Sequence, residues 1–170
     1  IALRMLWNKE DAEDATQEIL VRIVTRLSQF DFRSRLRTWA YRVAVNYILD
    51  IKKSATERLQ MTFESLADSL EEGLGSMAML QCLDRPHRLA YILGDIMELS
   101  GPEAADALDI SPDLFRKRLQ HARAAVLSFT KSYCGLASNT APCSCNRQVA
   151  AAVRRGMVNP DALTFADRQS

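Results

Sequence analysis

The stretch GPEAADALDISPDLFRKRLQHARAAV, residues 101–126, predicts two short helices joined by a tight turn. Pro102 suits the first turn of a helix, because no backbone N–H is needed there and the ring fixes φ. Ser111 suits the cap of the following helix, since its hydroxyl can accept a hydrogen bond from a free backbone N–H. Asp109 and Ile110 form the turn between the two helices. Pro102 and Ser111 therefore mark where the two predicted helices of this segment begin.

Apolar residues in this stretch recur at helical spacing, and cations occupy the opposite side of the second helix. The residues predicted to point inward are Ala105, Leu108, Leu119, Ala122 and either Leu114 or Phe115. The outer face of the second helix carries Arg116, Lys117, Arg118, Gln120, His121 and Arg123. Such a pair is typical of a helix-turn-helix, whose second helix enters the major groove of DNA.

The composition limits the classes of function that the chain can have. Hydrophobic residues make up 48% and charged residues 25% of the 170 residues, as in an ordinary soluble protein. The formal net charge is only +1, so affinity for nucleic acid has to come from local clusters of arginine and lysine. Because no apolar run reaches roughly 18 residues, we expect a cytoplasmic protein without membrane insertion. Neither a nucleophile–base pair nor a Walker-type glycine loop is present, so we expect no enzymatic activity.

The N-terminal half predicts two longer helices separated by an aromatic loop. The first is expected to begin near Asp11, which can cap it together with Asp14. Its predicted inward face carries Leu20, Ile23, Val24 and Leu27. The loop, residues 29–34, contains Phe30 and Phe32, and we expect the ring of one or the other to be exposed.

The second helix of this half is predicted over residues 35–53. Its expected core stripe is Leu36, Trp39, Ala40, Val43, Ala44, Tyr47 and Ile51. The opposite side carries Arg35, Thr38, Arg42, Asn46 and Lys53. Cations are thus predicted to form a polar stripe beside the aromatic loop.

The chain is predicted to be all-α, with two small helical domains. We expect the first domain at residues 1–54, a flexible linker at 55–76, the helix-turn-helix domain at 77–133 and a cysteine-containing tail at 134–170. The linker is rich in acids and small residues. A short helix is predicted at 148–155 in the tail.

Two segments resemble a known family. DAEDATQEILVRI (11–23) with FDFRSRLRTWAYRVAVNYILD (30–50) resembles region 2 of bacterial extracytoplasmic-function sigma factors, and LSGPEAADALDISPDLFRKRLQHARAAV (99–126) resembles their region 4. The family has another helix before the position of Ile1, so the first domain is expected to lack a helix. Asp109 stands where the family usually has glycine, at a cost of about 1 kcal/mol in the turn.

The resemblance implies three binding surfaces, although solvated helix faces would give similar patterns. The surface for the clamp helices of RNA polymerase would be Asp11, Glu13, Asp14, Gln17 and Glu18. Contacts to the −10 promoter element would come from Phe30, Asp31, Phe32, Arg33, Ser34, Arg35, Arg37, Arg42, Asn46 and Lys53. Contacts to the −35 element would come from Ser111, Pro112, Asp113, Arg116, Lys117, Arg118, His121 and Arg123.

The resemblance also implies the partners and the role. These are core RNA polymerase, through its clamp helices and flap, promoter DNA, and in some members an anti-sigma factor. The protein would initiate transcription of a specific regulon without a required cofactor. The alternative is a stand-alone helix-turn-helix regulator, which would bind operator DNA tightly by itself, as a dimer.

Three cysteines in the tail allow a further hypothesis. Cys134, Cys143 and Cys145 are either incidental thiols or a site for a soft metal or redox chemistry, since thiolates suit Zn and Cu(I). Tetrahedral zinc would need a fourth ligand, for which His121 or Cys82 is available. Some sigma factors of this type carry cysteine-bearing tails that sense metals, and this tail looks similar.

Overall fold

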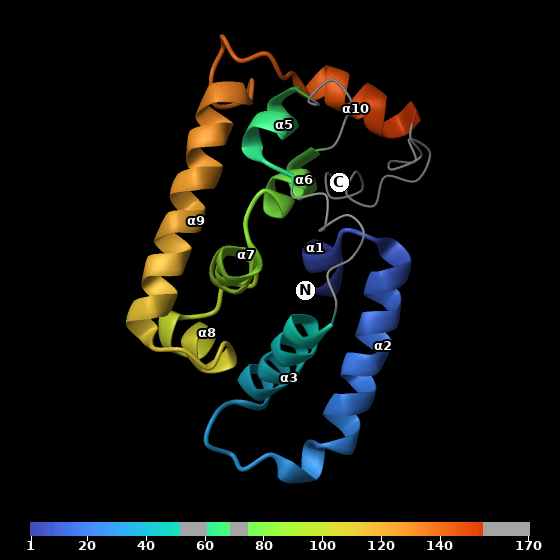
Figure 1. Ribbon diagram of the computed structural model, residues 1–170, viewed down its shortest axis with the longest axis vertical. Helices are drawn as coiled ribbons and strands as arrows, with labels where there is room; N and C mark the ends of the chain where they lie inside the picture. The colour runs from blue at the N-terminus through green and yellow to red at the C-terminus, as the bar shows by residue number, and fades with distance from the viewer. Residues whose placement is uncertain (52–60, 69–74, 155–170) are drawn as a thin grey trace, which may run out of the picture.

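The computed structural model describes residues 1–51, 61–68 and 75–154, and helices account for its main elements. Figure 1 shows them in the order α1 Ala2–Leu6, α2 Lys9–Thr25, α3 Leu36–Asp50, α5 Phe63–Asp68, α6 Gly75–Gln81, α7 Arg85–Tyr91, α8 Gly101–Ala107, α9 Pro112–Tyr133 and α10 Cys145–Arg154. The prediction of an all-α fold is confirmed. Among the described helices, none has the length and apolarity to cross a membrane.

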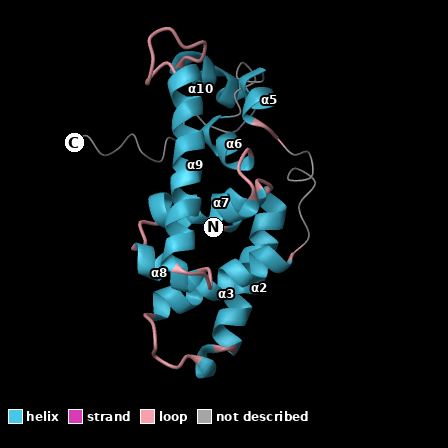
Figure 2. Ribbon diagram, turned by 60° about the vertical axis from the view of Figure 1, so that its left-hand side comes forward, coloured by secondary structure: helices cyan, strands magenta, loops and turns pink. Residues whose placement is uncertain are grey.

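The two predicted domains share one hydrophobic core. Helix α9 and the α2–α3 pair lie on opposite sides of the molecule, with α1, α7 and α8 between them (Figures 1 and 2). A single buried cluster joins residues such as Met5 in α1, Val45 in α3 and Leu93 beyond α7, all fully buried. The domain boundaries stay a prediction, but the helices on either side of the predicted linker pack against each other.

Helix α2 begins earlier than predicted and is capped by a different residue. Asn8 is the N-cap, and its side chain accepts a hydrogen bond from the Asp11 amide at 3.0 Å. The expected cap at Asp11 is therefore wrong, because Asn8 is an equally good capping residue one turn earlier. A short helix, α1, precedes α2 and was not predicted.

The buried faces of α2 and α3 differ from the predicted ones. Helix α2 buries Ala12, Ala15 and Ile19, whereas three of the four predicted inward residues are exposed: Leu20 at 55%, Val24 at 72% and Leu27 at 49%. Small alanines let α2 lie close to its neighbours, so the larger residues face outward. Helix α3 packs against both α2 and α8, and therefore buries Thr38 while Leu36 is 49% exposed.

The helix-turn-helix is confirmed in detail. Helix α8 runs Gly101–Ala107, and the Ser111 hydroxyl caps α9 by accepting from the Leu114 amide at 3.2 Å. Asp109 has φ 52°, the left-handed conformation that the family's glycine would adopt more easily. Of the two inward candidates, Phe115 is 3% exposed and Leu114 is 40% exposed.

The segments around the predicted linker and tail also contain helices. Helix α5 lies within the residues predicted as a flexible linker, and α6 begins at its end. Leu66 of α5 is buried in a second cluster together with Phe129 of α9. In the tail, the helix begins at Cys145, three residues before the predicted start, and is described to Arg154.

Candidate nucleic-acid interface

An aromatic cluster lies in the loop between α2 and α3. The Phe32 side chain is 84% exposed and sits on backbone with φ 60°. Its ring centroid is 4.6 Å from that of Phe30, which in turn lies 5.7 Å from Trp39 of α3. An exposed ring held in the left-handed region is uncommon, because a bulky side chain there costs energy. The prediction that Phe30 or Phe32 is exposed is confirmed by Phe32, while Phe30 is half-buried.

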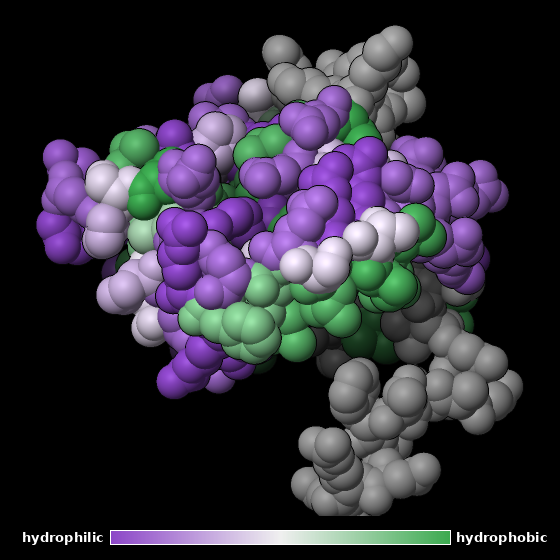
Figure 3. All heavy atoms as spheres, turned by 90° about the horizontal axis from the view of Figure 1, so that it is seen from below, coloured by the Kyte–Doolittle hydropathy of each residue, from purple (hydrophilic) through white to green (hydrophobic). Residues whose placement is uncertain are grey.

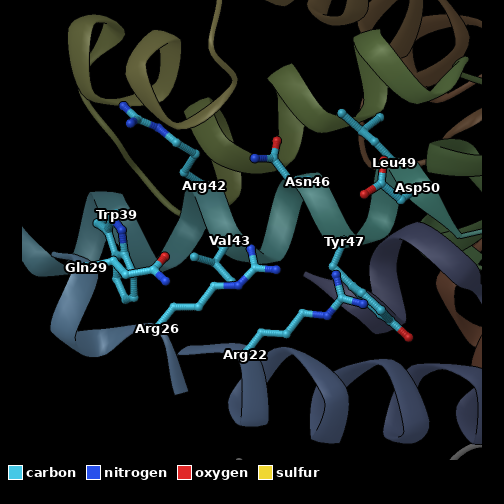
Figure 4. Close-up of a pocket in the computed structure, with 10 residues that line it drawn as sticks. All are labelled: Arg22, Arg26, Gln29, Trp39, Arg42, Val43, Asn46, Tyr47, Leu49 and Asp50. Carbon is cyan, nitrogen blue, oxygen red and sulfur yellow. The ribbon is translucent and has the colours of Figure 1, made fainter. Parts of the chain in front are cut away.

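A pocket of about 510 Å³ lies between α2 and α3 beside this loop (Figure 4). It is lined by Arg22, Arg26, Gln29, Trp39, Arg42, Val43, Asn46, Tyr47, Leu49 and Asp50. The Arg22 guanidinium lies 4.5 Å from the Tyr47 ring centroid, a cation–π contact. The lining thus combines two aromatic rings, two amides and three guanidinium groups. This is the set of groups that can stack on a base, bond its edge and hold a phosphate.

Two of the predicted −10 residues, Arg42 and Asn46, line this pocket, and the Phe30 ring lies beside its Trp39. Lys53 lies outside the described residues. In the loop, the Arg33 Nε is 2.7 Å from the Asp31 carboxylate, so these two residues pair with each other. Arg35 and Arg37 pair with Glu103 of α8, and Arg42 pairs with Asp106 of the same helix. Ser34 lines a separate cleft between α3 and α8.

Sequence reasoning missed the contribution of α2 to the pocket. Arg22 lies in the last turn of α2, and Arg26 is the C-cap residue four positions later, so both lie on the same side at the end of the helix. The spacing of these two arginines can be read in the sequence, but no residue near them indicates that α3 packs beside this end of α2. Trp39 and Tyr47 were predicted as core residues, whereas both are only half-buried and line the pocket.

The predicted −35 residues lie on the N-terminal half of α9. Arg116 and Lys117 are 72% and 73% exposed, and both pair with Asp113 one turn earlier. Hydrogen bonding to Lys117 and its charge hold the pKa of the Asp113 carboxyl below its usual value. Since these pairs are exposed, they are weak, and the cations remain available to DNA phosphates.

The other end of this basic face is tied into the protein. The Arg123 Nε lies 3.0 and 3.1 Å from the two carboxylate oxygens of Asp95, and this pairing raises the pKa of Arg123. The His121 ring lies 4.5 Å from that of His87 on α7. Arg118 is half-buried, whereas Ser111 and Pro112 are exposed at the start of the helix. The structure therefore separates an exposed N-terminal part of α9 from a more constrained part.

Comparisons with known proteins agree with these features. Residues 1–58 match the model for sigma-70 region 2. The ECF RNA polymerase sigma factor SigW of Bacillus subtilis is 28% identical over 147 residues, which cover 74% of this chain and 79% of SigW. The ECF RNA polymerase sigma factor SigG of Mycobacterium tuberculosis is 28% identical over 155 residues, which cover 71% of this chain and 42% of SigG. CnrH, solved in complex with the cytosolic domain of CnrY, aligns at a TM-score of 0.58 with 26% identity, over 76% of this chain and 78% of CnrH.

Over about three quarters of its length, the chain is similar to ECF RNA polymerase sigma factors. The region 2 match contains α1, α2 and α3, and with them the aromatic loop and the pocket. The chain spans most of SigW but less than half of SigG.

A second exposed surface of this chain lies on α2. The predicted polymerase-binding residues Asp11, Glu13, Asp14 and Gln17 are exposed, and Glu18 is half-buried against Arg22 at 2.9 Å. Three apolar side chains continue this surface along the helix: Leu20, Val21 and Val24, exposed at 55%, 55% and 72%. Sequence reasoning had assigned Leu20 and Val24 to the core. Acids followed by exposed apolar residues form a surface suited to another protein.

The surface around the aromatic loop has a different character. Viewed from the end of the molecule that carries this loop, it is mostly hydrophilic, with a hydrophobic band along it (Figure 3). Exposed aromatic and apolar side chains in and near the loop are Leu27, Phe32 and Leu36. Rings and cations therefore occur together at this end.

The tail brings two of its three cysteines together. Cys134 and Cys143 form an isolated parallel bridge, in which the Gly135 amide donates to the Cys143 carbonyl at 3.0 Å. Paired backbones of this kind lie roughly 5 Å apart, which is close enough for two thiolates to bind one ion. The side chain of Cys145 lies outside the described residues. Among the described residues, no group of three His, Cys, Asp or Glu is placed to hold a metal.

Neither His121 nor Cys82 suits the role of fourth ligand beside the tail cysteines. His121 and Cys134 are separated by most of α9, about 20 Å at 1.5 Å per residue, so His121 cannot join the tail site. Cys82 donates to the Ala78 carbonyl, and burial raises the pKa of its thiol to about 11. A thiol with this pKa stays protonated near neutral pH and is a poor metal ligand.

Proposed function

We propose that this chain acts as a sigma factor of the ECF type. It would capture an unpaired base of the −10 promoter element in the pocket between α2 and α3, while α9 lies in the major groove of the −35 element. The pocket supports this most strongly, because rings, amides and guanidinium groups meet there beside the exposed Phe32. Opening a duplex requires groups that hold bases after they leave the stack. The exposed cations Arg116 and Lys117 would bind backbone phosphates and set the register of α9.

The α2 surface would bind core RNA polymerase. Its exposed carboxylates can pair with cations of the clamp helices, which orients the complex and speeds association. Its exposed apolar residues would supply buried area, with Val24 most exposed among them. We also propose that the flap binds the helix-turn-helix domain, and that the protein acts in the cytoplasm, without enzymatic activity. CnrH was solved in complex with the cytosolic domain of CnrY. We therefore also propose an anti-sigma factor as a protein partner of this chain.

Two measurements made together test this role. A gel shift on promoter DNA is carried out with and without core polymerase, and transcription is measured in vitro on a promoter library. We expect tight DNA binding and transcripts only when polymerase is present, because each DNA-binding face of the chain is small. Tight binding without polymerase would instead indicate the stand-alone regulator.

We further propose that the tail cysteines bind a soft metal or act in redox sensing. The observation that favours this is the backbone pairing of Cys134 with Cys143. When bound, Zn or Cu(I) would be held by thiolates and would fix the loop that connects these two residues. No other part of the proposed role depends on this metal.

The triple substitution of serine for Cys134, Cys143 and Cys145 should abolish binding of about one equivalent of Zn or Cu(I), since serine is a much weaker ligand for soft metals. Equilibrium dialysis followed by metal analysis measures this, and Cys82→Ser is the matched control. Binding of core polymerase should be unchanged in all variants. If the triple variant still binds one equivalent, the tail is not the metal site.

A further inference from the structure

The first helix of the helix-turn-helix places its acids against the arginines of the −10 surface. Glu103 Oε1 lies 3.3 Å from Arg35 Nη1 and 3.7 Å from Arg37 Nη2. One turn later, the Asp106 carboxylate pairs with Arg42, whose Nε also donates to the Asp106 carbonyl at 3.0 Å. Glu103 and Asp106 are three residues apart on α8 and therefore share one face. A single acidic face thus engages three cations.

These three arginines belong to the surface that we propose for −10 DNA. A carboxylate and a phosphate offer guanidinium the same kind of charged oxygen acceptor. Hydrogen bonds from Ser100 hold the pKa of the Glu103 carboxyl below its usual value, and Arg35 and Arg37 act in the same direction. Glu103 is therefore ionised near neutral pH. DNA and α8 compete for the same donors.

The ion pairs between α3 and α8 lie beside a cleft, outside the buried apolar core that the two helices share. A cleft of about 560 Å³ lies at this junction, lined by Ser34, Arg35, Thr38, Ser100, Pro102, Glu103 and Asp106. The Arg35 and Arg37 side chains are 76% and 55% exposed. Exposed ion pairs are individually weak and are screened by salt. A polyanion at high local concentration can therefore displace the acids.

We propose that the acidic face of α8 is an autoinhibitory contact, which occupies Arg35, Arg37 and Arg42 until promoter DNA, presented on polymerase, replaces it. This inference rests on the proposed −10 function of α3. It explains how a chain with a basic DNA-binding surface would bind DNA weakly when free. Releasing the arginines requires only that these side chains change partner, because the buried apolar packing of α8 on α3 is separate from the ion pairs.

The double substitution Glu103→Gln with Asp106→Asn tests the contact. Glutamine at 103 can still bond Ser100, so the start of α8 is preserved. Binding of the free chain to a fluorescein-labelled single-stranded 20-mer of random sequence is measured by anisotropy over a range of salt concentrations. We expect affinity about tenfold higher at low salt, and a log–log salt slope steeper by about two, because three arginines gain phosphates.

Two controls separate the contact from a change of overall charge. The variant Glu10→Gln with Glu64→Gln has the same charge change at exposed acids on α2 and α5, and should bind DNA like the parent chain. Adding Arg42→Ala to the double variant should remove part of the gain and reduce the salt slope. Glu103→Gln alone should give a smaller gain of the same kind, which guards against misfolding of the double variant.

The outcomes are distinct. Equal gains in the test and control variants, or no gain in a folded test variant, would overturn the autoinhibitory contact. Core polymerase binding is measured in parallel on every variant. If the parent chain binds polymerase but the test variant shows no gain, only this contact fails. If the chain binds neither polymerase nor DNA in any form, the proposed function itself fails, and the contact fails with it.

Discussion

Replacing Arg88 by methionine should lower the free energy of unfolding by about 2–5 kcal/mol, because buried carbonyl groups would lose their donors. Arg88 is only 3% exposed. Its Nη1 donates to the Met5 carbonyl at 2.6 Å, and its Nη2 donates to the Leu83 carbonyl at 2.9 Å. These bonds join the end of α1 to the turn after α6. Methionine keeps the apolar stem but supplies no donor, so the loss is polar in origin.

Urea unfolding followed by circular dichroism measures this effect. Arg4→Met is the matched control, because Arg4 is exposed and its replacement should change stability by less than about 0.5 kcal/mol. Arg88→Lys should fall between the two, since one ammonium group cannot reproduce the fork of a guanidinium. A loss below about 1 kcal/mol for Arg88→Met would mean that water replaces the guanidinium at these carbonyls.

Arg88 also illustrates a contact between the two predicted domains that the sequence does not reveal. Nothing near this residue in the sequence indicates that it bonds a helix more than 80 positions earlier, as the Met5 contact does. Arg85 makes a similar connection, donating to the Ile48 and Ile51 carbonyls at the end of α3 at 2.9 and 3.0 Å. Composition and spacing describe each helix alone. The shared core depends on long-range contacts that these patterns do not contain.

The helix-turn-helix could be predicted because its determinants are local. Ser111 caps α9 through an amide three residues later, and the turn at Asp109 depends on one φ angle. The faces of α2 and α3 depend instead on which helix covers them. Periodicity identified the larger apolar residues of α2, but its core contact is made by Ala12 and Ala15. Close helix approach through alanines leaves Val24 exposed, available for a partner.

The candidate site could be predicted only where its residues are close together in the sequence. The aromatic loop and the basic residues of α3 are adjacent in sequence, so they could be recognised together. The pocket needs Arg22 and Arg26 from α2 as well, and their place opposite Trp39 follows from how the two helices cross. The pairing of Arg42 with Asp106 joins positions 64 residues apart and has no sequence pattern.

Replacing Phe32 by alanine should reduce promoter opening by roughly 5- to 150-fold, the equivalent of about 1–3 kcal/mol for one lost base–aromatic stack. The ring is 84% exposed, so it contributes little to the core, and stability should change by less than about 0.5 kcal/mol. Its position beside Phe30 and near the pocket is where a base leaving the duplex would first meet a flat surface. Permanganate reactivity of unpaired thymines in the complex with core polymerase measures the opening.

Two further variants connect this effect to stacking. Phe32→Tyr keeps a ring and should open DNA within about twofold of the parent chain. Leu136→Ala removes a side chain that is 83% exposed in the tail, and should have no effect on opening. Binding of core polymerase should be the same for all three, because Phe32 lies outside the α2 surface. If Phe32→Ala opens promoters as fast as Phe32→Tyr, the base must be held by Trp39 and Tyr47 alone, and the exposed ring must have another role.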